Sequence, residues 1–408
     1  MRPQDEIEFL AELSRVVASS PKLHSVLEWI VHETPARLSA DGGSIKLTGD
    51  DDVTVTVIRR RDGIGSWPQA ITMSVMGYLM SARNSLTTSD ILTDPRFPGL
   101  KDVESPVRAI LALPMQVGNR IIGMLGVGCR ALGRHWSEQE VRLMEIVAAH
   151  SGKVIELIQQ RQRTDELQQD MVLAGKLQQG LVPAQPLRVG PWEILGRVVP
   201  ARHVGGDYYD YFVLDRDRFG VAIADVVGKG FPAAMLVSCI KVLVRLGCDG
   251  RRPLGDAFAE MNSYLARRDD PGQCVTLFFG EMDVRRGLMR YVRAGHNYPL
   301  VRRRDGDVEE MKEGERPLGM FEDIDYQEGQ VQMEDGDAIL LYTDGVTEAL
   351  GPDGEFFGEE RLCSLWRRCP AHSPRQAIEE ILEHVRSFRG AVPQSDDIAI
   401  VIVASKLE

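Results

Sequence analysis

The chain has 408 residues, a formal net charge of −12 and 26% charged residues. This length fits two domains and a connector, and the acidic balance argues against nucleic acid as a main partner, because phosphate-backbone binding needs a basic surface. The six cysteines include no Cys-x-x-Cys pair, so neither a zinc site nor a disulfide framework is predicted. No run of about 18 apolar residues is present and the first residues do not read as a signal peptide, so we expect a cytoplasmic protein without a membrane span.

Helical and strand patterns alternate through the first part of the chain. Apolar residues recur at helical spacing over 7–17, and Ser20-Pro21 supplies the start of a second helix that Pro35 should kink or end. Apolar runs further along predict strands at 44–47, 53–58, 109–117 and 121–127. The last two flank Gly118-Asn119, a pair typical of a hairpin turn.

This order of elements resembles that of a GAF domain, a small α/β sensor module. The resemblance is carried by ADGGSIKL (40–47), TSDILTDPRFPG (88–99) and, after the hairpin, WSEQEVRLMEIVAAHSG. It implies an α/β sandwich over 1–150 that receives a signal, either a small molecule or a protein, which the sequence does not identify. Cys129, at the end of a strand, is interpreted as a packed small hydrophobe rather than as a chromophore or redox cysteine.

Residues 151–186 form the predicted connector, which continues a helix that starts at a capping box of Ser137 and Glu140. No helix breaker follows until Gly175, and Pro183 ends the segment. A seven-residue frame along this helix has eight seam positions: Leu157, Gln160, Thr164, Leu167, Met171, Ala174, Gln178 and Leu181. Five of these eight residues are apolar. This weak coiled-coil pattern predicts a parallel homodimer through the linker helix; the alternative is a solvated linker helix.

In residues 187–408, acidic residues stand at the ends of four apolar strand patterns. They are Asp207 after Gly205-Gly206, Asp225 after the run 219–224, Asp344 after 338–342, and Asp396-Asp397 before 398–404. Strand ends can bring side chains from distant sequence to one point, where these carboxylates would repel one another unless cations lay among them. A single aspartate at such a place is usually a turn residue, but the set of four favours a metal site. Oxygen ligands suit Mg²⁺ or Mn²⁺ better than zinc.

Five motifs in this region resemble, in order, those of a PPM-type metal-dependent serine/threonine phosphatase of the bacterial SpoIIE/RsbU branch. They are VGGDYYD, ADVVGKGFPAAM, AGHNYPL, LYTDGVTEA and SDDIAIV, preceded by the entry sequence LQQGLVP. The resemblance implies an α+β chain whose C-terminal domain is an α-β-β-α sandwich of two antiparallel sheets.

The resemblance also implies a set of metal ligands for two Mn²⁺ or Mg²⁺ ions. The ligands would be Asp207, Asp225, the main-chain carbonyl of Val226, Asp344 and Asp396. Asp225 would bridge the ions, which would activate a water for in-line attack on phosphorus without a covalent intermediate. Gly345 would be a tight-turn residue beside Asp344. The sequence leaves open whether Asp396 or Asp397 is the ligand.

Other residues near these motifs have two interpretations each. Arg202 either binds the substrate phosphate bidentately or is a surface arginine, and Lys229 meets either phosphate or solvent. His296 and Asn297 are expected to stabilise a turn rather than to act as acids. A basic stretch consists of Arg285, Arg286, Arg290, Arg293 and 302–304. It either docks an acidic or phosphorylated partner or consists of paired charges on a hairpin, and we favour the second interpretation.

Together these patterns predict a cytoplasmic, sensor-regulated protein serine/threonine phosphatase. The resemblance implies a phosphorylated STAS-type anti-anti-sigma protein as substrate, within a bacterial partner-switching pathway. A non-catalytic sensor scaffold with the phosphatase fold is the alternative, although all four acidic positions are present. A Ca²⁺-binding module would need carbonyl-rich loops of the EF-hand type, which the sequence lacks.

Overall fold

The structure, a computed structural model, describes residues 8–9, 11–16, 22–48, 56–60, 67–267, 274–370 and 373–405. Contacts within the chain divide it into two compact units, one ending at Leu167 and the other starting at Gln168. This division falls inside the segment predicted as the connector. Within the described ranges, no helix has both the length and the apolar character that crossing a membrane requires.

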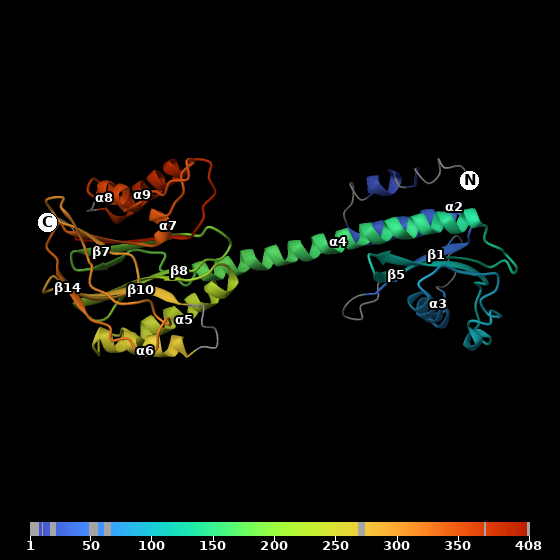
Figure 1. The fold of residues 1–408 in the computed structure, drawn as a ribbon, viewed down its shortest axis with the longest axis horizontal. Helices are drawn as coiled ribbons and strands as arrows, with labels where there is room; N and C mark the ends of the chain where they lie inside the picture. The colour runs from blue at the N-terminus through green and yellow to red at the C-terminus, as the bar shows by residue number, and fades with distance from the viewer. Residues whose placement is uncertain are drawn as a thin grey trace. The chain divides into compact units, whose positions relative to one another are not determined.

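The first unit is built on one antiparallel sheet with strand order β2-β1-β5-β4-β3. Its strands are β1 (Gly42–Leu47), β2 (Thr56–Arg60), β3 (Leu86–Thr88), β4 (Ala109–Val117) and β5 (Arg120–Cys129). Its helices are α2 (Leu23–Arg37), α3 (Gln69–Ala82), the short η1 (Pro98–Leu100) and the first part of α4 (Glu138–Gln179). Helices α2 and α4 cover one face of the sheet and α3 the other, each over its own apolar core (Figure 1).

Most of the predicted elements of this unit are confirmed. The hairpin turns at Gly118, whose φ of 58° suits glycine, and the capping box closes through a Ser137 N–H donated to Glu140 Oε2 at 2.8 Å. Pro35 lies inside α2, close to its end. Residues 53–55 of one predicted strand lie outside the described ranges, and β2 starts at Thr56. Cys129 is buried, which raises the pKa of its thiol, as expected of a packed side chain.

The second unit is a sandwich of two antiparallel sheets, as the resemblance implied. One sheet has the order β14-β11-β10-β9-β8 and the other β13-β12-β15-β16-β7-β6. The first contains β8 (Asp207–Val213), β9 (Arg218–Val226), β10 (Val275–Asp283), β11 (Leu288–Ala294) and β14 (Gly329–Gln332). The second contains β6 (Leu187–Val189), β7 (Trp192–Val199), β12 (Leu300–Arg302), β13 (Val308–Glu310), β15 (Ala338–Tyr342) and β16 (Ile398–Ser405).

Helices cover the outer faces of this sandwich (Figure 1). They are α5 (Phe231–Gly247) and α6 (Leu254–Ala266) on the first sheet, and α8 (Glu359–Trp366) and α9 (Pro374–Arg389) on the second, with the short α7 (Asp344–Thr347) after β15. A third apolar core fills the space between the sheets. The predicted α-β-β-α architecture is therefore confirmed.

Strand register decides which way the acidic side chains face. Asp207 pairs directly with Asp225 across β8 and β9. Tyr209 and Ile223, two residues further along the same strands, belong to the core between the sheets. Because side chains alternate along a strand, Asp207 and Asp225 share that inner face, at the end of the sandwich.

A buried ion pair ties α5 to β8. Asp210 is fully buried, and the Arg245 guanidinium donates to both of its carboxylate oxygens, at 2.6 and 2.7 Å. The Tyr208 hydroxyl donates a further bond to the same carboxylate at 2.9 Å. Breaking such a pair by removing one partner is costly, because the other polar groups lose their compensation.

We expect Asp210→Ala to lower the unfolding free energy of this domain by about 3 kcal/mol, the low end for a buried pair because Arg245 is partly exposed. The control is Asp215→Ala, which removes an exposed carboxylate bound to Arg218 at 2.7 Å and should cost below about 1 kcal/mol. Differential scanning calorimetry of the full chain measures both, with the transition of the other domain as internal reference. Equal effects of the two substitutions would contradict this account of Asp210.

Candidate metal centre

Four strand ends bring the predicted acidic residues to one end of the sandwich. Asp207 and Asp225 come from the first sheet. Asp344 and Asp397 come from the second, where β15 and β16 are neighbours and Tyr342 pairs with Ile400. Among the contacts that join the sheets there, the Thr343 hydroxyl donates to Asp207 Oδ2 at 2.7 Å, and the Gly206 N–H donates to Asp397 Oδ2 at 2.7 Å.

The acidic side chains are close enough to disturb one another's ionisation. Burial, followed by the neighbouring carboxylates, raises the pKa of Asp225 to about 7. Burial, then Glu348 and Asp396, raises the pKa of Asp344 to about 6. Burial and the Asp225 charge hold the pKa of Asp207 well above its ordinary value. A cluster of this kind is stabilised by cations placed among its oxygens.

Three of the carboxylates are meanwhile held by partners of different kinds. Asp207 accepts from Thr343, whereas Asp397 accepts from the N–H groups of Ala201 and Gly206 at 2.8 and 2.7 Å. Asp396 pairs with the Lys229 ammonium at 2.7 Å. With the side chains so directed, no three acidic, histidine or cysteine side chains of the described segments are grouped closely enough to chelate an ion.

The two adjacent aspartates, which the sequence left interchangeable, have different surroundings. Asp397 is 8% exposed and its two oxygens hold the turn at 201–206 in place. The Asp396 side chain is 38% exposed and its contact is with a lysine. This difference favours Asp396 as the ligand and Asp397 as the residue that orients the loop, which stays a prediction.

Three glycines allow the loops to approach one another. A Cβ on Gly206 would lie 2.8 Å from the Val226 carbonyl oxygen, and one on Gly205 would lie 2.1 Å from Asp397 Oδ2. At Gly345 the Cβ would come within 1.8 Å of the Asp397 carbonyl oxygen. Gly345 thus lets α7 approach the chain before β16. The resulting donor set, carboxylates with a main-chain carbonyl, has the chemistry that Mg²⁺ and Mn²⁺ prefer, so the residues present fit such ions.

Arg202 and His296, two further residues that the sequence singled out, have different surroundings. Arg202 is exposed beside this site, and its charge acts on Lys229. His296 is buried, its Nδ1 lies 2.9 Å from Thr276 Oγ1, and burial lowers its pKa to about 3. A neutral imidazole at physiological pH cannot donate a proton as an imidazolium, which agrees with the predicted turn-stabilising role.

The end of α4 touches the turn that precedes Asp207, a contact that the sequence analysis missed. The Gln178 side-chain amide donates to the Gly205 carbonyl at 2.6 Å and accepts from the Gly205 N–H at 3.0 Å. At Gly175 a Cβ would lie 2.0 Å from the His203 carbonyl oxygen, so only glycine allows the helix this close. The seven-residue spacing places Gln178 in the predicted coiled-coil seam, and no local pattern indicates its contact with Gly205.

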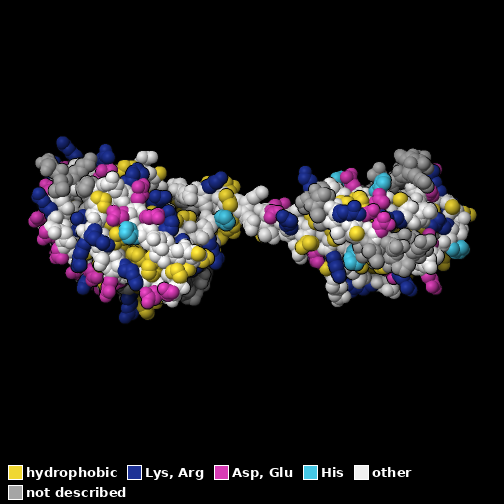
Figure 2. All heavy atoms as spheres, turned by 90° about the horizontal axis from the view of Figure 1, so that it is seen from above, with side chains coloured by type: hydrophobic (Ala, Val, Ile, Leu, Met, Phe, Trp, Pro, Cys, Tyr) yellow, Lys and Arg dark blue, Asp and Glu magenta, His cyan; other side chains and the backbone are white. Residues whose placement is uncertain are grey.

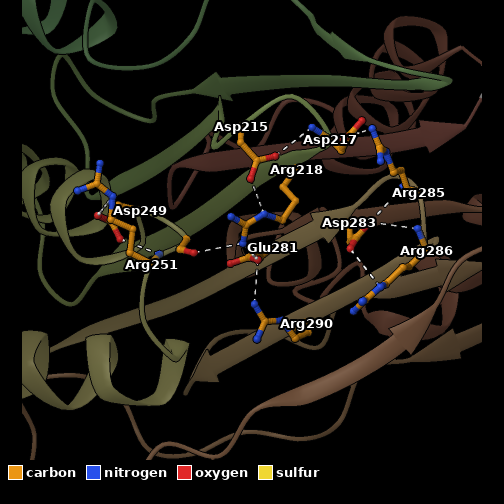
Figure 3. Close-up of polar contacts among 11 residues, drawn as sticks. Asp215, Asp217, Arg218, Asp249, Arg251, Glu281, Asp283, Arg285, Arg286 and Arg290 are labelled. Carbon is orange, nitrogen blue, oxygen red and sulfur yellow. Dashed lines mark hydrogen bonds and ion pairs between the residues drawn. The ribbon is translucent and has the colours of Figure 1, made fainter.

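The basic stretch is largely paired within its own domain. Glu281 Oε1 is shared by Arg218 and Arg290, each at 2.8 Å, as Figure 3 shows. Arg285 pairs with Asp217 at 2.7 Å. Acidic and basic side chains are interspersed over the visible face of this domain (Figure 2). These pairs support the interpretation as self-compensating charges rather than as a docking patch.

Comparison with known proteins agrees with this geometry. Residues 215–406 match the family described as Stage II sporulation protein E (SpoIIE), and residues 22–155 match the GAF domain. The chain contains a GAF domain followed by a SpoIIE-type PPM phosphatase domain. The range matched by the SpoIIE family includes Asp225, Asp344, Asp396 and Asp397, and the range matched by the GAF domain lies within the first unit of the fold.

Individual relatives are similar to this chain over somewhat more than half of its length. Protein IcfG of Synechocystis is 29% identical over 56% of this chain, and phosphoserine phosphatase RsbU of Bacillus subtilis is 27% identical over 59%. The matched region spans 40% of IcfG and 72% of RsbU. The solved SiaA-PP2C domain of Pseudomonas aeruginosa is 24% identical, with a TM-score of 0.49, over 60% of this chain and 99% of that domain.

The raised pKa values of the site predict an unusual pH dependence of stability. Between the ordinary aspartate pKa and about 7, the folded metal-free domain binds more protons than the unfolded chain. Its unfolding free energy should therefore fall as the pH rises through this window. Asp225→Asn should reduce this decrease of the unfolding free energy with pH. It should also raise the melting temperature in EDTA at pH 8, by at least about 2–4 °C for each 1 kcal/mol gained in a domain of this size. A wild-type domain whose stability in EDTA rises from pH 5 to pH 8 would contradict the clustering of these carboxylates.

Proposed function

We propose that this chain is a metal-dependent phosphoprotein serine/threonine phosphatase. The proposed metal ligands are Asp207, Asp225, the Val226 carbonyl, Asp344 and Asp396. The observation that carries the proposal is that these residues, from four separate strand ends, meet at one end of the sandwich: Asp207 pairs with Asp225, and Thr343, next to Asp344, donates to Asp207 at 2.7 Å. Burial, followed by the charges of neighbouring carboxylates, raises the pKa of Asp207, Asp225 and Asp344. Two Mn²⁺ or Mg²⁺ ions would supply an activated water and neutralise phosphoryl charge.

The chain's own residues would orient this centre and the substrate. Thr343 fixes Asp207, and its hydroxyl accepts the Ala399 N–H at 2.8 Å, which ties the contact to β16. Asp397 holds the turn 201–206 through two main-chain bonds. Arg202, which is exposed beside the site, would bind the substrate phosphate bidentately.

The substrate we propose is a phosphorylated STAS-type anti-anti-sigma protein in a partner-switching pathway. RsbU, to which this chain is similar, is named a phosphoserine phosphatase, and this name supports a phosphoserine or phosphothreonine protein as substrate. The GAF domain would receive the signal, as a small molecule or a protein.

Asp225→Ala and Asp344→Ala should each lower Mn²⁺-dependent hydrolysis of 4-nitrophenyl phosphate at least about a hundredfold. The physical reason is that even partners which only orient a metal's ligands change activity by about 10–100-fold. Glu348→Gln is the matched control, because Glu348 lies near Asp344 and is exposed but is not a proposed ligand. Circular dichroism checks the fold of all three variants.

Retained turnover in both aspartate variants would contradict the proposed ligands. A folded wild-type protein that hydrolyses neither this ester nor a phosphoprotein in Mn²⁺ would instead favour the alternative of a sensor scaffold, which keeps the fold for partner binding.

We also propose that the chain forms a parallel homodimer through α4. Every residue from 161 to 170 on this helix is exposed, and Leu157 and Leu167 of the predicted seam are 61% and 62% exposed. A second α4 would cover these side chains. The seam ends before Gln178, because that side chain binds Gly205 and Leu181 packs on the core under α5.

The contact between Gln178 and Gly205 gives this helix an effect on the site. Gln178→Ala should weaken Mn²⁺ binding about three- to tenfold, since two hydrogen bonds that hold the turn before Asp207 are lost. Gln179→Ala, at an exposed neighbouring position, is the control. Fragments 168–408 and 187–408 should differ in the same direction, because only the first retains Gln178. Isothermal titration calorimetry with MnCl₂ measures all four, and identical affinities for the two glutamine variants would exclude this coupling.

A further inference from the structure

Lys229 stands at the tip of a loop whose backbone conformation requires glycine on both sides of it. Gly228 and Gly230 have φ angles of 116° and 80°, a region that side-chain-bearing residues rarely adopt. A Cβ at either position would meet no atom within 4 Å. The glycines are therefore needed for the backbone conformation, which presents Lys229, and not for close packing.

The Lys229 ammonium connects the two halves of the candidate metal centre. It lies 2.7 Å from Asp396 Oδ2 and donates to the Ser395 carbonyl at 2.9 Å, a residue 166 positions away in sequence. Lys229 follows β9 of the first sheet, and Asp396 precedes β16 of the second. Burial and neighbouring carboxylates raise the pKa of Asp225 and Asp344, and the ammonium offsets a part of this rise, so its field reaches carboxylates that it does not touch.

We propose that Lys229 is a resident counter-ion which exchanges Asp396 for the substrate phosphate when divalent cations bind. This inference rests on the proposed function and adds a role for a residue outside the proposed ligand set. The ammonium occupies Asp396 Oδ2, where a divalent cation bound by this carboxylate would compete with it and repel it. Metal binding therefore releases Lys229.

The released side chain has a defined second partner. Lys229 is half exposed, and its four-carbon stem can turn without moving the backbone. Lys229 pairs with Asp396, and the residue before Arg202, Ala201, donates its N–H to the adjacent Asp397 at 2.8 Å. The loops that carry the two cations are therefore neighbours, and the charge of Arg202 acts on Lys229. Two cations beside an acidic site repel each other and are both stabilised by a dianionic phosphate between them. Lys229 and Arg202 would thus hold the substrate phosphate together.

Direct Mn²⁺ titration of the full chain tests the first half of the exchange. Lys229→Gln should bind Mn²⁺ about three- to tenfold more tightly than the wild type, because a competing cation is removed from a partly exposed pair. Lys229→Arg keeps the charge and should stay close to the wild type. Lys312→Gln is the matched control, since Lys312 forms a lysine–glutamate pair of 3.2 Å with Glu310 in the same domain.

Inhibition by inorganic phosphate tests the second half. In saturating Mn²⁺, the inhibition constant of phosphate against 4-nitrophenyl phosphate hydrolysis should rise at least about fivefold in Lys229→Gln and stay unchanged in Lys312→Gln. Unchanged or weaker Mn²⁺ binding by folded Lys229→Gln overturns the proposal, and so does an unchanged phosphate constant. A wild-type chain that binds no Mn²⁺ would overturn the proposed function instead, so the two failures are distinguishable.

Discussion

The mutual repulsion of carboxylates at one end of the sandwich is the constraint on which the structure of the phosphatase domain depends. Asp207 and Asp225 face each other across two strands, and Asp344 and Asp397 approach them from the other sheet. Apolar burial alone would separate such groups, because charged forms are destabilised away from water. The fold offsets part of this cost by giving three carboxylates of the site a partner: a hydroxyl for Asp207, two main-chain N–H groups for Asp397 and an ammonium for Asp396.

The position of the two sheets relative to each other therefore decides the geometry of the site. Each sheet supplies part of the acidic set, and the contacts from Thr343 to Asp207 and from Gly206 to Asp397 are among the polar links between them. On the outer side of the first sheet, the Asp210–Arg245 pair anchors β8 to α5. The strand that begins at Asp207 is thus held on both of its faces.

The turn 201–206 is the point where other parts of the domain reach the site. It is held from one side by the Asp397 carboxylate and from the other by the Gln178 amide at the end of α4. Gln178 and Asp397 bind different main-chain atoms, so each restrains the turn separately. If regulation acts through the end of α4, as we propose, it would reach Asp207 through this turn.

The sequence by itself determined the elements whose signals are local. The Gly118-Asn119 hairpin, the Ser137–Glu140 capping box and the apolar runs of the sandwich strands are encoded within a few residues, and all are present. The motifs also identified the acidic strand ends and predicted the α-β-β-α architecture. Helix α3 was missed, although its buried Ile71, Val75 and Leu79 recur at helical spacing.

Only the tertiary structure decided which side chains hold the acidic ones. The partners of Thr343, Gln178 and Lys229 lie 136, 27 and 166 residues away in sequence, and strand register and sheet packing set those contacts. The different surroundings of Asp396 and Asp397 have the same origin. Residue type and spacing can place a carboxylate at a strand end, but its neighbour across the sandwich depends on how two sheets pack, which no local pattern encodes.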